Sequence, residues 1–158
     1  MPDAVVITCS NRAANGTYAD RSGPLLVDAL RGWGFECSPP VVVPDGPPVG
    51  EALRAAIAGG ADVVLTTGGT GLTPTDQTPE QTAPLLTSEV PGIAEALRAA
   101  GVTAGVPTAM LSRGLAGLAD RTLIVNLPGS SGGVRDAIAV LEPVLVHAVQ
   151  QIAGGDHG

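Results

Sequence analysis

Two patterns of apolar residues alternate along the chain. Short β-branched runs such as Ala4–Cys9 and Asp62–Thr67 are typical of strands buried in a parallel sheet. Stretches with apolar residues three and four apart, as from Leu25 to Trp33, predict helices between these strands. The resulting order is three strand–helix repeats, a hairpin and a final helix. It predicts an α/β fold, a three-layer α/β/α sandwich with a mostly parallel sheet and one antiparallel hairpin strand.

Prolines refine this pattern. Phe35–Val43 is typical of a second strand, but Pro39 and Pro40 remove hydrogen-bond donors, so the strand is expected near a sheet edge. Pro143 interrupts the helical pattern from Val134 to Ile152 and predicts a kink or a split.

Two further segments join these elements. Leu115–Leu118 and Thr122–Leu127 predict the hairpin, and Ser10 to about Ser22 predicts a polar loop. Thr78 is expected to cap a helix that has Pro79 at its first position.

The composition favours a single domain spanning residues 1–158, because 158 residues with 44% hydrophobic content suffice for one core. The apolar runs are shorter than the ~20 residues that cross a bilayer. The segment after Met1 lacks an export signal, so we expect a cytoplasmic protein. A net charge of −7 and only three aromatic residues disfavour nucleic acid as a partner.

The chain contains no lysine, which excludes P-loop and Schiff-base enzymes. Cys9 and Cys37 are expected to be reduced, buried and small hydrophobic residues rather than nucleophiles. His147 and His157 show no zinc-binding spacing with them. The chemistry is therefore left to carboxylates, arginines, hydroxyls, backbone amides or a hard metal ion.

One glycine-rich loop, Thr66–Glu80, follows the third predicted strand. Glycines let backbone N–H groups approach an anion, and ligands of open α/β sheets lie at the carboxyl ends of strands. Asp76 within this loop suits Mg²⁺, which prefers oxygen ligands and bridges to phosphates. The alternative is an ordinary strand-to-helix turn in which Asp76 caps a helix.

Two other loops follow predicted strands and are expected to converge on the same crevice. Asn126–Ser131 offers amides and hydroxyls at a helix start, or simply an N-cap. In the first loop Arg12 could contact a phosphate bidentately, whereas Asp20 and Ser22 are better explained as helix caps.

Three further residues outside these loops each allow two interpretations. Asp45 is either a functional carboxylate or a turn residue in Pro-Asp-Gly. Ser112 and Arg113 either bind an acidic ligand or face solvent.

Together these motifs resemble the MoaB/Mog family of molybdenum cofactor biosynthesis proteins. Thr67–Glu80, TGGTGLTPTDQTPE, is similar to the GGTG-x-x-P-x-D-x-TPE loop of that family. Ser10–Arg12, Pro107–Arg113 and Asn126–Gly129 match other family segments in order, so the resemblance covers nearly the whole chain.

The resemblance implies a compact, usually trimeric α/β domain of the molybdopterin-binding kind. Mog-type members, the molybdopterin adenylyltransferases, adenylylate molybdopterin with ATP and Mg²⁺ and release pyrophosphate, before another protein inserts the metal. Asp76 and Asp45 correspond to functionally important aspartates, and we expect both to be catalytic and to hold the metal. The residues expected to bind pterin or nucleotide are Ser10, Arg12, Thr67, Gly68, Gly69, Thr70, Gly71, Ser112, Arg113, Asn126, Pro128, Gly129 and Ser130.

This chain departs from the family after Asn126–Gly129, where relatives often carry basic residues. Without lysine, Arg12, Arg113 and Arg135 must supply any positive charge for ligand phosphates.

Two alternatives remain, and a third is disfavoured. One is a MoaB-type paralogue that binds pterin with little or no adenylyl transfer, and a second is an assembly module. A Rossmann dehydrogenase is disfavoured, because Ser10–Gly16 lacks G-x-G-x-x-G.

Overall fold

A seven-stranded sheet forms the middle of the computed structural model, which describes residues 1–155. The strand order is β2-β1-β4-β7-β6-β5, and β3 also pairs with β1. The strands are β1 (Asp3–Cys9), β2 (Glu36–Cys37), β3 (Val41–Val43), β4 (Val63–Thr67), β5 (Ser88–Glu89), β6 (Ala116–Ala119) and β7 (Thr122–Leu127). Strand β6 is antiparallel to both β5 and β7, and the pairs around β1 and β4 are parallel. The predicted sheet, mostly parallel with one antiparallel hairpin strand, is confirmed.

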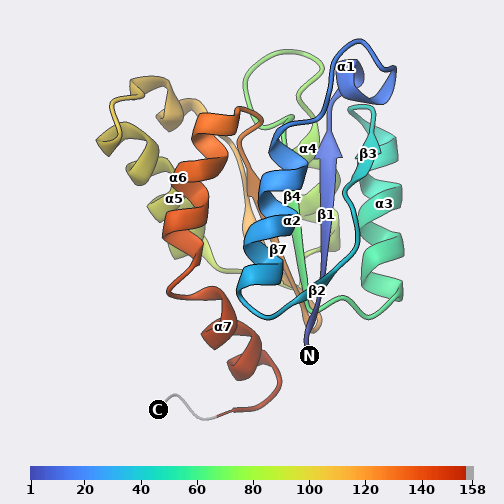
Figure 1. Ribbon diagram of the computed structural model, residues 1–158, viewed down its shortest axis with the longest axis vertical. Coiled ribbons are helices and arrows are strands. Elements are labelled where there is room, and N and C mark those ends of the chain that lie inside the picture. The colour runs from blue at the N-terminus through green and yellow to red at the C-terminus, as the bar shows by residue number, and fades with distance from the viewer. Residues whose placement is uncertain (156–158) are drawn as a thin grey trace.

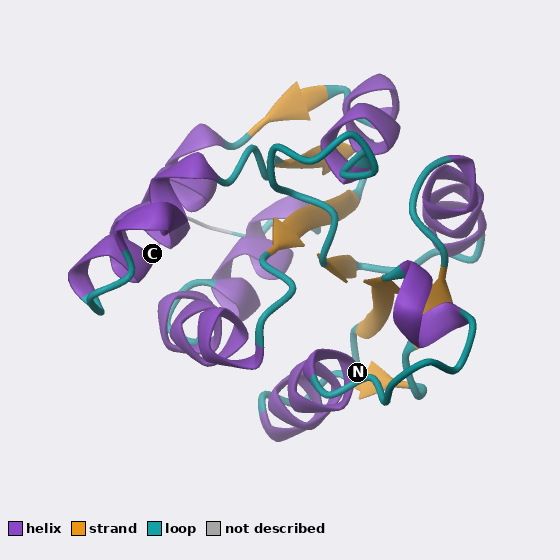
Figure 2. Ribbon diagram, turned by 90° about the horizontal axis from the view of Figure 1, so that it is seen from above, coloured by secondary structure: helices purple, strands orange, loops and turns teal. Residues whose placement is uncertain are grey.

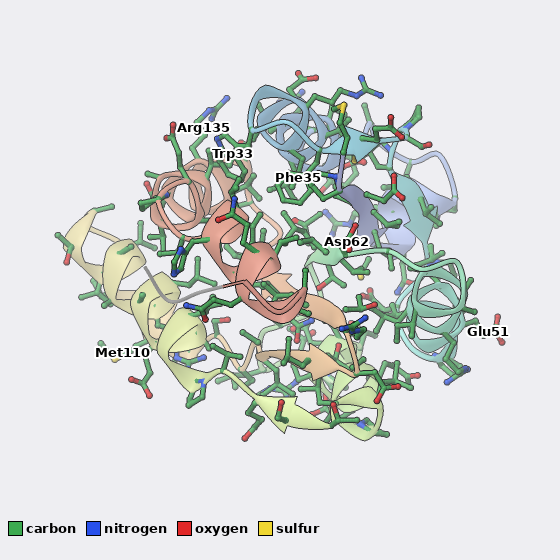
Figure 3. All side chains as sticks on the ribbon, turned by 90° about the horizontal axis from the view of Figure 1, so that it is seen from below. Trp33, Phe35, Glu51, Asp62, Met110 and Arg135 are labelled. Carbon is green, nitrogen blue, oxygen red and sulfur yellow. The ribbon has the colours of Figure 1, made fainter. Side chains whose placement is uncertain are left out.

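Helices cover both faces of the sheet, as Figures 1 and 2 show, so the predicted three layers are confirmed. The helices are α1 (Asn11–Ala14), α2 (Ser22–Gly32), α3 (Pro47–Ala58), α4 (Thr78–Thr82), α5 (Pro91–Thr103), α6 (Ser131–Leu141) and α7 (Leu145–Ile152), with 3₁₀ turns η1 (Ala83–Leu85) and η2 (Pro107–Leu111). Residues of α2, α5, α6 and α7 share one core cluster, and α3 packs into a second cluster. In Figure 3 Phe35 points inward, whereas Glu51 and Met110 lie at opposite outer edges.

The prolines act as predicted. Strands β2 and β3 pair with opposite ends of β1, and Pro39 and Pro40 lie in the break between them. The final helix is split into α6 and α7, and Pro143 lies in the gap.

Several local expectations were wrong. Ser22 is the first residue of α2 rather than its cap, and Arg21 occupies the cap position. The polar loop from Ser10 contains the short helix α1, because the Ser10 hydroxyl caps it by accepting from Ala13 N. Thr78 is the first residue of α4 rather than its cap, and Gln77 occupies the cap position. Cys37 is only half-buried. The pattern also missed β5 and both 3₁₀ turns.

Within residues 1–155, every helix is too short or too polar to span a membrane. His157 lies outside the described residues.

Three neighbouring parallel strands, β1, β4 and β7, position the site. Strand β4 and strand β7 are buried along their whole lengths, and β4 pairs with β1 on one side and β7 on the other. The loops that follow these strands therefore emerge at one edge of the sheet, at the top of Figure 1. The predicted convergence of three loops is thus seen.

Candidate functional site

The loop after β4 directs four consecutive carbonyl groups toward donors of the protein. Thr78 contributes its Oγ1 and N atoms, which donate to Gly68 O and Gly69 O at 2.9 and 3.1 Å. Arg113 contributes its N and Nε atoms, which donate to Thr70 O and Gly71 O, both at 2.9 Å. Hydrogen bonds from Thr78 and Arg113 thereby hold the main chain of the loop in place.

Planarity of the peptide group determines where the loop's N–H groups lie. In a trans peptide the N–H of each residue points opposite to the carbonyl of the residue before it. The N–H groups of residues 69–72 therefore point away from Thr78 and Arg113. Within residues 1–155 these four N–H groups have no protein acceptor, so they would be donors for a ligand bound at this loop. Such a row of backbone N–H groups forms an anion-binding concavity.

Glycine is required at two positions of this loop. Gly68 and Gly69 have φ of +98° and +69°, a region that side chains rarely adopt. A Cβ on Gly68 would collide with the Cys9 carbonyl oxygen, and one on Gly69 would lie 3.0 Å from Asp45 Oδ1. Glycine is therefore needed at both positions because of the backbone conformation and because neighbouring atoms leave no room for a Cβ.

Short hydrogen bonds join the loops after β4 and β7. Thr67 Oγ1 donates to Pro128 O at 2.6 Å, and Gly68 N donates to Leu127 O at 3.0 Å. Ser22 at the start of α2 also donates to Gly129 O at 2.8 Å. Hydrogen bonds therefore connect three segments that are distant in sequence: the loop after β4, the loop after β7 and the start of α2. We call these connected segments the rim.

A polar hollow of about 740 Å³ opens on one side of the rim. The predicted site residues that line it are Ser10, Arg12, Asp45, Thr67, Gly68, Gly69, Asp76, Gly129 and Ser130. Tyr18 and Arg21 also line it, and sequence reasoning had not selected them. Asp20, which the sequence favoured as a cap, accepts from Gly23 N at the start of α2 and from the Thr8 hydroxyl.

Two carboxylates are close enough to affect each other in this polar hollow. Burial, followed by the negative charge of Asp76, raises the pKa of Asp45 above its ordinary value. Asp45 Oδ1 is buried and has no hydrogen-bond partner in the described chain. Asp76 Oδ2 accepts from Thr73 N at 3.1 Å within the loop, so Asp76 does not act as a helix cap. An unpartnered oxygen beside a second carboxylate suits a cation.

No group of three His, Cys, Asp or Glu side chains in residues 1–155 forms a protein-only metal cage. Mg²⁺ does not need one, because it is commonly held by one or two carboxylates together with waters and substrate phosphates. Asp45 and Asp76 beside the free N–H groups fit that donor set.

An apolar hollow of about 660 Å³ lies on the other side of the rim. The predicted site residues that line it are Thr70, Gly71, Ser112, Asn126, Pro128 and Ser130. Leu97 and Ala137 add apolar surface, and Arg98 and Asp136 are the charged residues in its lining. Sequence reasoning had not selected Arg98 or Asp136, which lie on α5 and α6, two helices that are distant in sequence and pack against each other.

Two predicted ligand residues are instead bonded to the protein, and a third lies away from both hollows. Buried Asn126 donates from Nδ2 to the hydroxyls of Thr66 and Thr82 and accepts from Leu115 N. Arg113 bonds the loop and borders neither hollow. Arg135 is exposed on α6, near the outer edge of the view in Figure 3, and it also lines neither hollow.

Cys9 behaves as expected of an inert thiol. It is buried and unpaired, and burial raises its pKa to about 12. A thiol with such a pKa stays protonated at neutral pH and is a poor nucleophile.

A family described as "Probable molybdopterin binding domain" matches residues 5–147. The chain belongs to this family. The expected resemblance to MoaB/Mog proteins is therefore confirmed.

Individual relatives support the same family assignment. The chain is 43% identical over 156 residues to a "Molybdenum cofactor biosynthesis bifunctional protein" of Synechococcus elongatus. The matched region covers 98% of this chain but only 49% of that relative. It is 33% identical to a "Molybdopterin adenylyltransferase" of Helicobacter pylori J99, with 94% of this chain and 86% of the relative covered.

Among solved structures, the Mog protein of Mycobacterium ulcerans is 50% identical with a TM-score of 0.92, covering 96% of this chain and 99% of that one. The chain thus corresponds to about half of the bifunctional relative and to nearly all of the Mog structure.

Replacing Asp45 should stabilise the protein. A carboxyl whose pKa is raised in the folded state weakens folding above that pKa, and folding strengthens as the pH falls through it. Asp45→Asn should therefore raise Tm slightly at neutral pH, by about 1 °C, because solvent screens a partly exposed carboxyl. Thermal melts at pH 7 test this, with exposed Asp28→Asn on α2 as the control. A lower Tm for Asp45→Asn alone would contradict the electrostatic account.

Replacing Asn126 should have the opposite effect on stability. Asn126→Ala removes three hydrogen bonds, two of them buried, each worth ~1 kcal/mol, and should lower the free energy of unfolding by about 2–4 kcal/mol. Urea unfolding measures the change, and exposed Gln150→Ala should stay within ~0.5 kcal/mol of the parent. Unchanged stability of Asn126→Ala with lost ligand binding would instead favour a direct ligand contact.

Proposed function

We propose that the chain transfers the adenylyl group of ATP to molybdopterin, with Mg²⁺, in molybdenum cofactor biosynthesis. The observation that carries this proposal is the row of four free N–H groups between a polar and an apolar hollow. Such a row suits phosphate, which both substrates carry, and the two hollows suit two different substrates. The relative named molybdopterin adenylyltransferase gives independent support.

We assign the pterin ring to the apolar hollow. Its volume of about 660 Å³ lies in the range of small-molecule sites, ~300–1,000 Å³, and its lining is mostly apolar with a few polar groups. Leu97 and Ala137 would contact the flat ring, and Arg98 and Asp136 would face its polar edge. The pterin's phosphate would then lie at the loop that separates the hollows.

We assign the nucleotide to the polar hollow. Arg12 and Arg21 line it and would contact phosphate oxygens, while the N–H groups of residues 69–72 donate to phosphates from the rim. Asp45 and Asp76 would hold Mg²⁺, which offsets the charge of the phosphates when bound. The shared cation would offset the repulsion between these carboxylates and the phosphates.

The reaction follows from these positions. A phosphate oxygen of molybdopterin attacks the α-phosphorus of ATP, a new P–O–P bond forms, and the bond to the β-phosphate breaks to release pyrophosphate. Phosphoryl and nucleotidyl transfers depend chiefly on positioning and charge stabilisation. The residues of the chain therefore align two anions and exclude water, and no protein nucleophile is required.

The proposal also covers the oligomeric state of the protein and its location in the cell. We propose a trimer of single-domain subunits, active in the cytoplasm, that passes adenylylated molybdopterin to a metal-inserting protein. A pterin-binding paralogue without transfer activity, or an assembly module, would bind molybdopterin and form no adenylylated product.

Asp76 tests the reaction itself. Asp76→Asn retains an oxygen for the Thr73 N–H, so the loop should keep its shape while cation binding weakens. We expect kcat to fall at least ~100-fold, a loss typical of a removed electrostatic group. The KM for molybdopterin should change less than ~2-fold.

The assay follows adenylylated molybdopterin and pyrophosphate after incubation with ATP, Mg²⁺ and molybdopterin. Exposed Glu95→Gln on α5 is the control and should match the parent protein. Product formation by Asp76→Asn at the parent rate would remove Asp76 from the site, and no product from the parent would favour the binding-only alternative.

Gly132 tests the assignment of the two hollows. It lies in α6, lines the apolar hollow, and a Cβ there would meet no atom within 4 Å. Gly132→Leu should therefore fold well, since glycine in a helix costs ~0.5–1 kcal/mol relative to alanine. Its side chain should obstruct the pterin and raise the KM for molybdopterin about tenfold, or ~1.4 kcal/mol.

The KM for ATP should stay within ~2-fold in Gly132→Leu, and Gly132→Ala is the matched control. A rise in the KM for ATP with an unchanged KM for molybdopterin would reverse the assignment.

A further inference from the structure

Arg113 bonds both ends of the phosphate-facing loop. Its backbone N and its Nε donate to Thr70 O and Gly71 O, and its Nη2 donates to Asp76 O, each at 2.9 Å. The first two contacts lie near the start of the loop, and the third lies on the residue whose carboxylate borders the polar hollow.

Glu80 fixes the guanidinium group in this position. Its two oxygens accept from Nη1 at 2.6 Å and from Nη2 at 3.1 Å, the bidentate geometry that only arginine provides. The hydrogen bond from Arg113 lowers the pKa of Glu80, so the pair persists to lower pH than an isolated glutamate would allow.

These contacts leave little of Arg113 for a ligand. Four of its side-chain hydrogen bonds go to Gly71, Asp76 and Glu80, and a guanidinium has five N–H donors. Arg113 also lines neither of the two hollows. With one side-chain N–H left over and no place in either hollow, Arg113 is poorly suited to the substrate-binding role that its place in the sequence suggested.

We propose that Arg113 is a positioning residue: by holding the carbonyls of Thr70, Gly71 and Asp76, it turns the N–H groups of Gly71 and Leu72 toward phosphate and holds the Asp76 carboxylate at the polar hollow. Glu80 acts through Arg113. The role deepens the proposed adenylyl transfer and rests on it wherever activity is measured.

A lysine cannot replace Arg113 in this role. An ammonium group is a point charge without the planar fork, so it cannot hold Gly71 O, Asp76 O and Glu80 together. Arg113→Lys therefore keeps the charge and removes the positioning, which separates the two explanations.

Steady-state kinetics of the full chain with ATP, Mg²⁺ and molybdopterin test the role. Arg113→Lys should lower kcat about 10–100-fold, as loss of an orienting partner does, with both substrate KM values within ~3-fold. The Mg²⁺ concentration for half-maximal rate should rise, because Asp76 is displaced. Glu80→Gln should cause a smaller loss in the same direction, and the double variant should be no worse than Arg113→Lys.

Exposed Arg121→Lys in the β6–β7 turn is the matched control and should behave like the parent protein. A raised KM for either substrate in Arg113→Lys, with Glu80→Gln unaffected, would overturn the proposal in favour of direct ligand contact. An unchanged kcat in Arg113→Lys would overturn it as well.

Amide hydrogen exchange provides a readout that does not depend on activity. In the ligand-free protein, Arg113→Lys should speed exchange across residues 70–80, whereas Arg121→Lys should not. If the parent protein forms no adenylylated product, the proposed function fails, and this exchange result still decides the role of Arg113. Unchanged exchange across residues 70–80 would show that Arg113 does not hold the loop.

Discussion

Each peptide group must point its carbonyl and its N–H in opposite directions, and the site depends on how the loop after β4 meets that constraint. Thr78 and Arg113 donate hydrogen bonds to four successive carbonyls of the loop. The opposite side is then a row of N–H groups. Glycine at 68 and 69 is needed because any Cβ there would meet the protein itself. The main chain can thus attract phosphate in a protein that has no lysine.

The two sides of this loop differ in chemistry because different elements face it. The first loop and Asp45 make one hollow polar, whereas the packing of α5 beside α6 makes the other apolar. A substrate with a flat ring at one end and a phosphate at the other matches this division. The arrangement has a cost in stability, since Asp45 keeps a buried oxygen without a partner. Unfavourable charge of this kind is characteristic of functional sites.

Much of the fold could be predicted because local rules and tertiary structure agree. Pro143 ended a helix, Pro39 and Pro40 broke an edge strand, and the hairpin formed where the pattern placed it. Gly68 and Asp76, which were selected from the sequence, do line the polar hollow, because their placement depends mainly on residues close to them in the chain. The sequence could not show that Arg113 donates a hydrogen bond to Glu80, 33 positions away. Nor could it show that the Asn126 amide donates to the hydroxyls of Thr66 and Thr82. Those pairings exist only once strands and helices have packed.

The central claim is that the N–H groups of residues 69–72 bind substrate phosphate. It is tested most directly by the amide spectrum of ¹⁵N-labelled protein titrated with ATP and Mg²⁺. The account predicts that these four amide signals move most, because each gains a phosphate oxygen as acceptor. Saturating binding that leaves all four signals in place and shifts only signals elsewhere would contradict it.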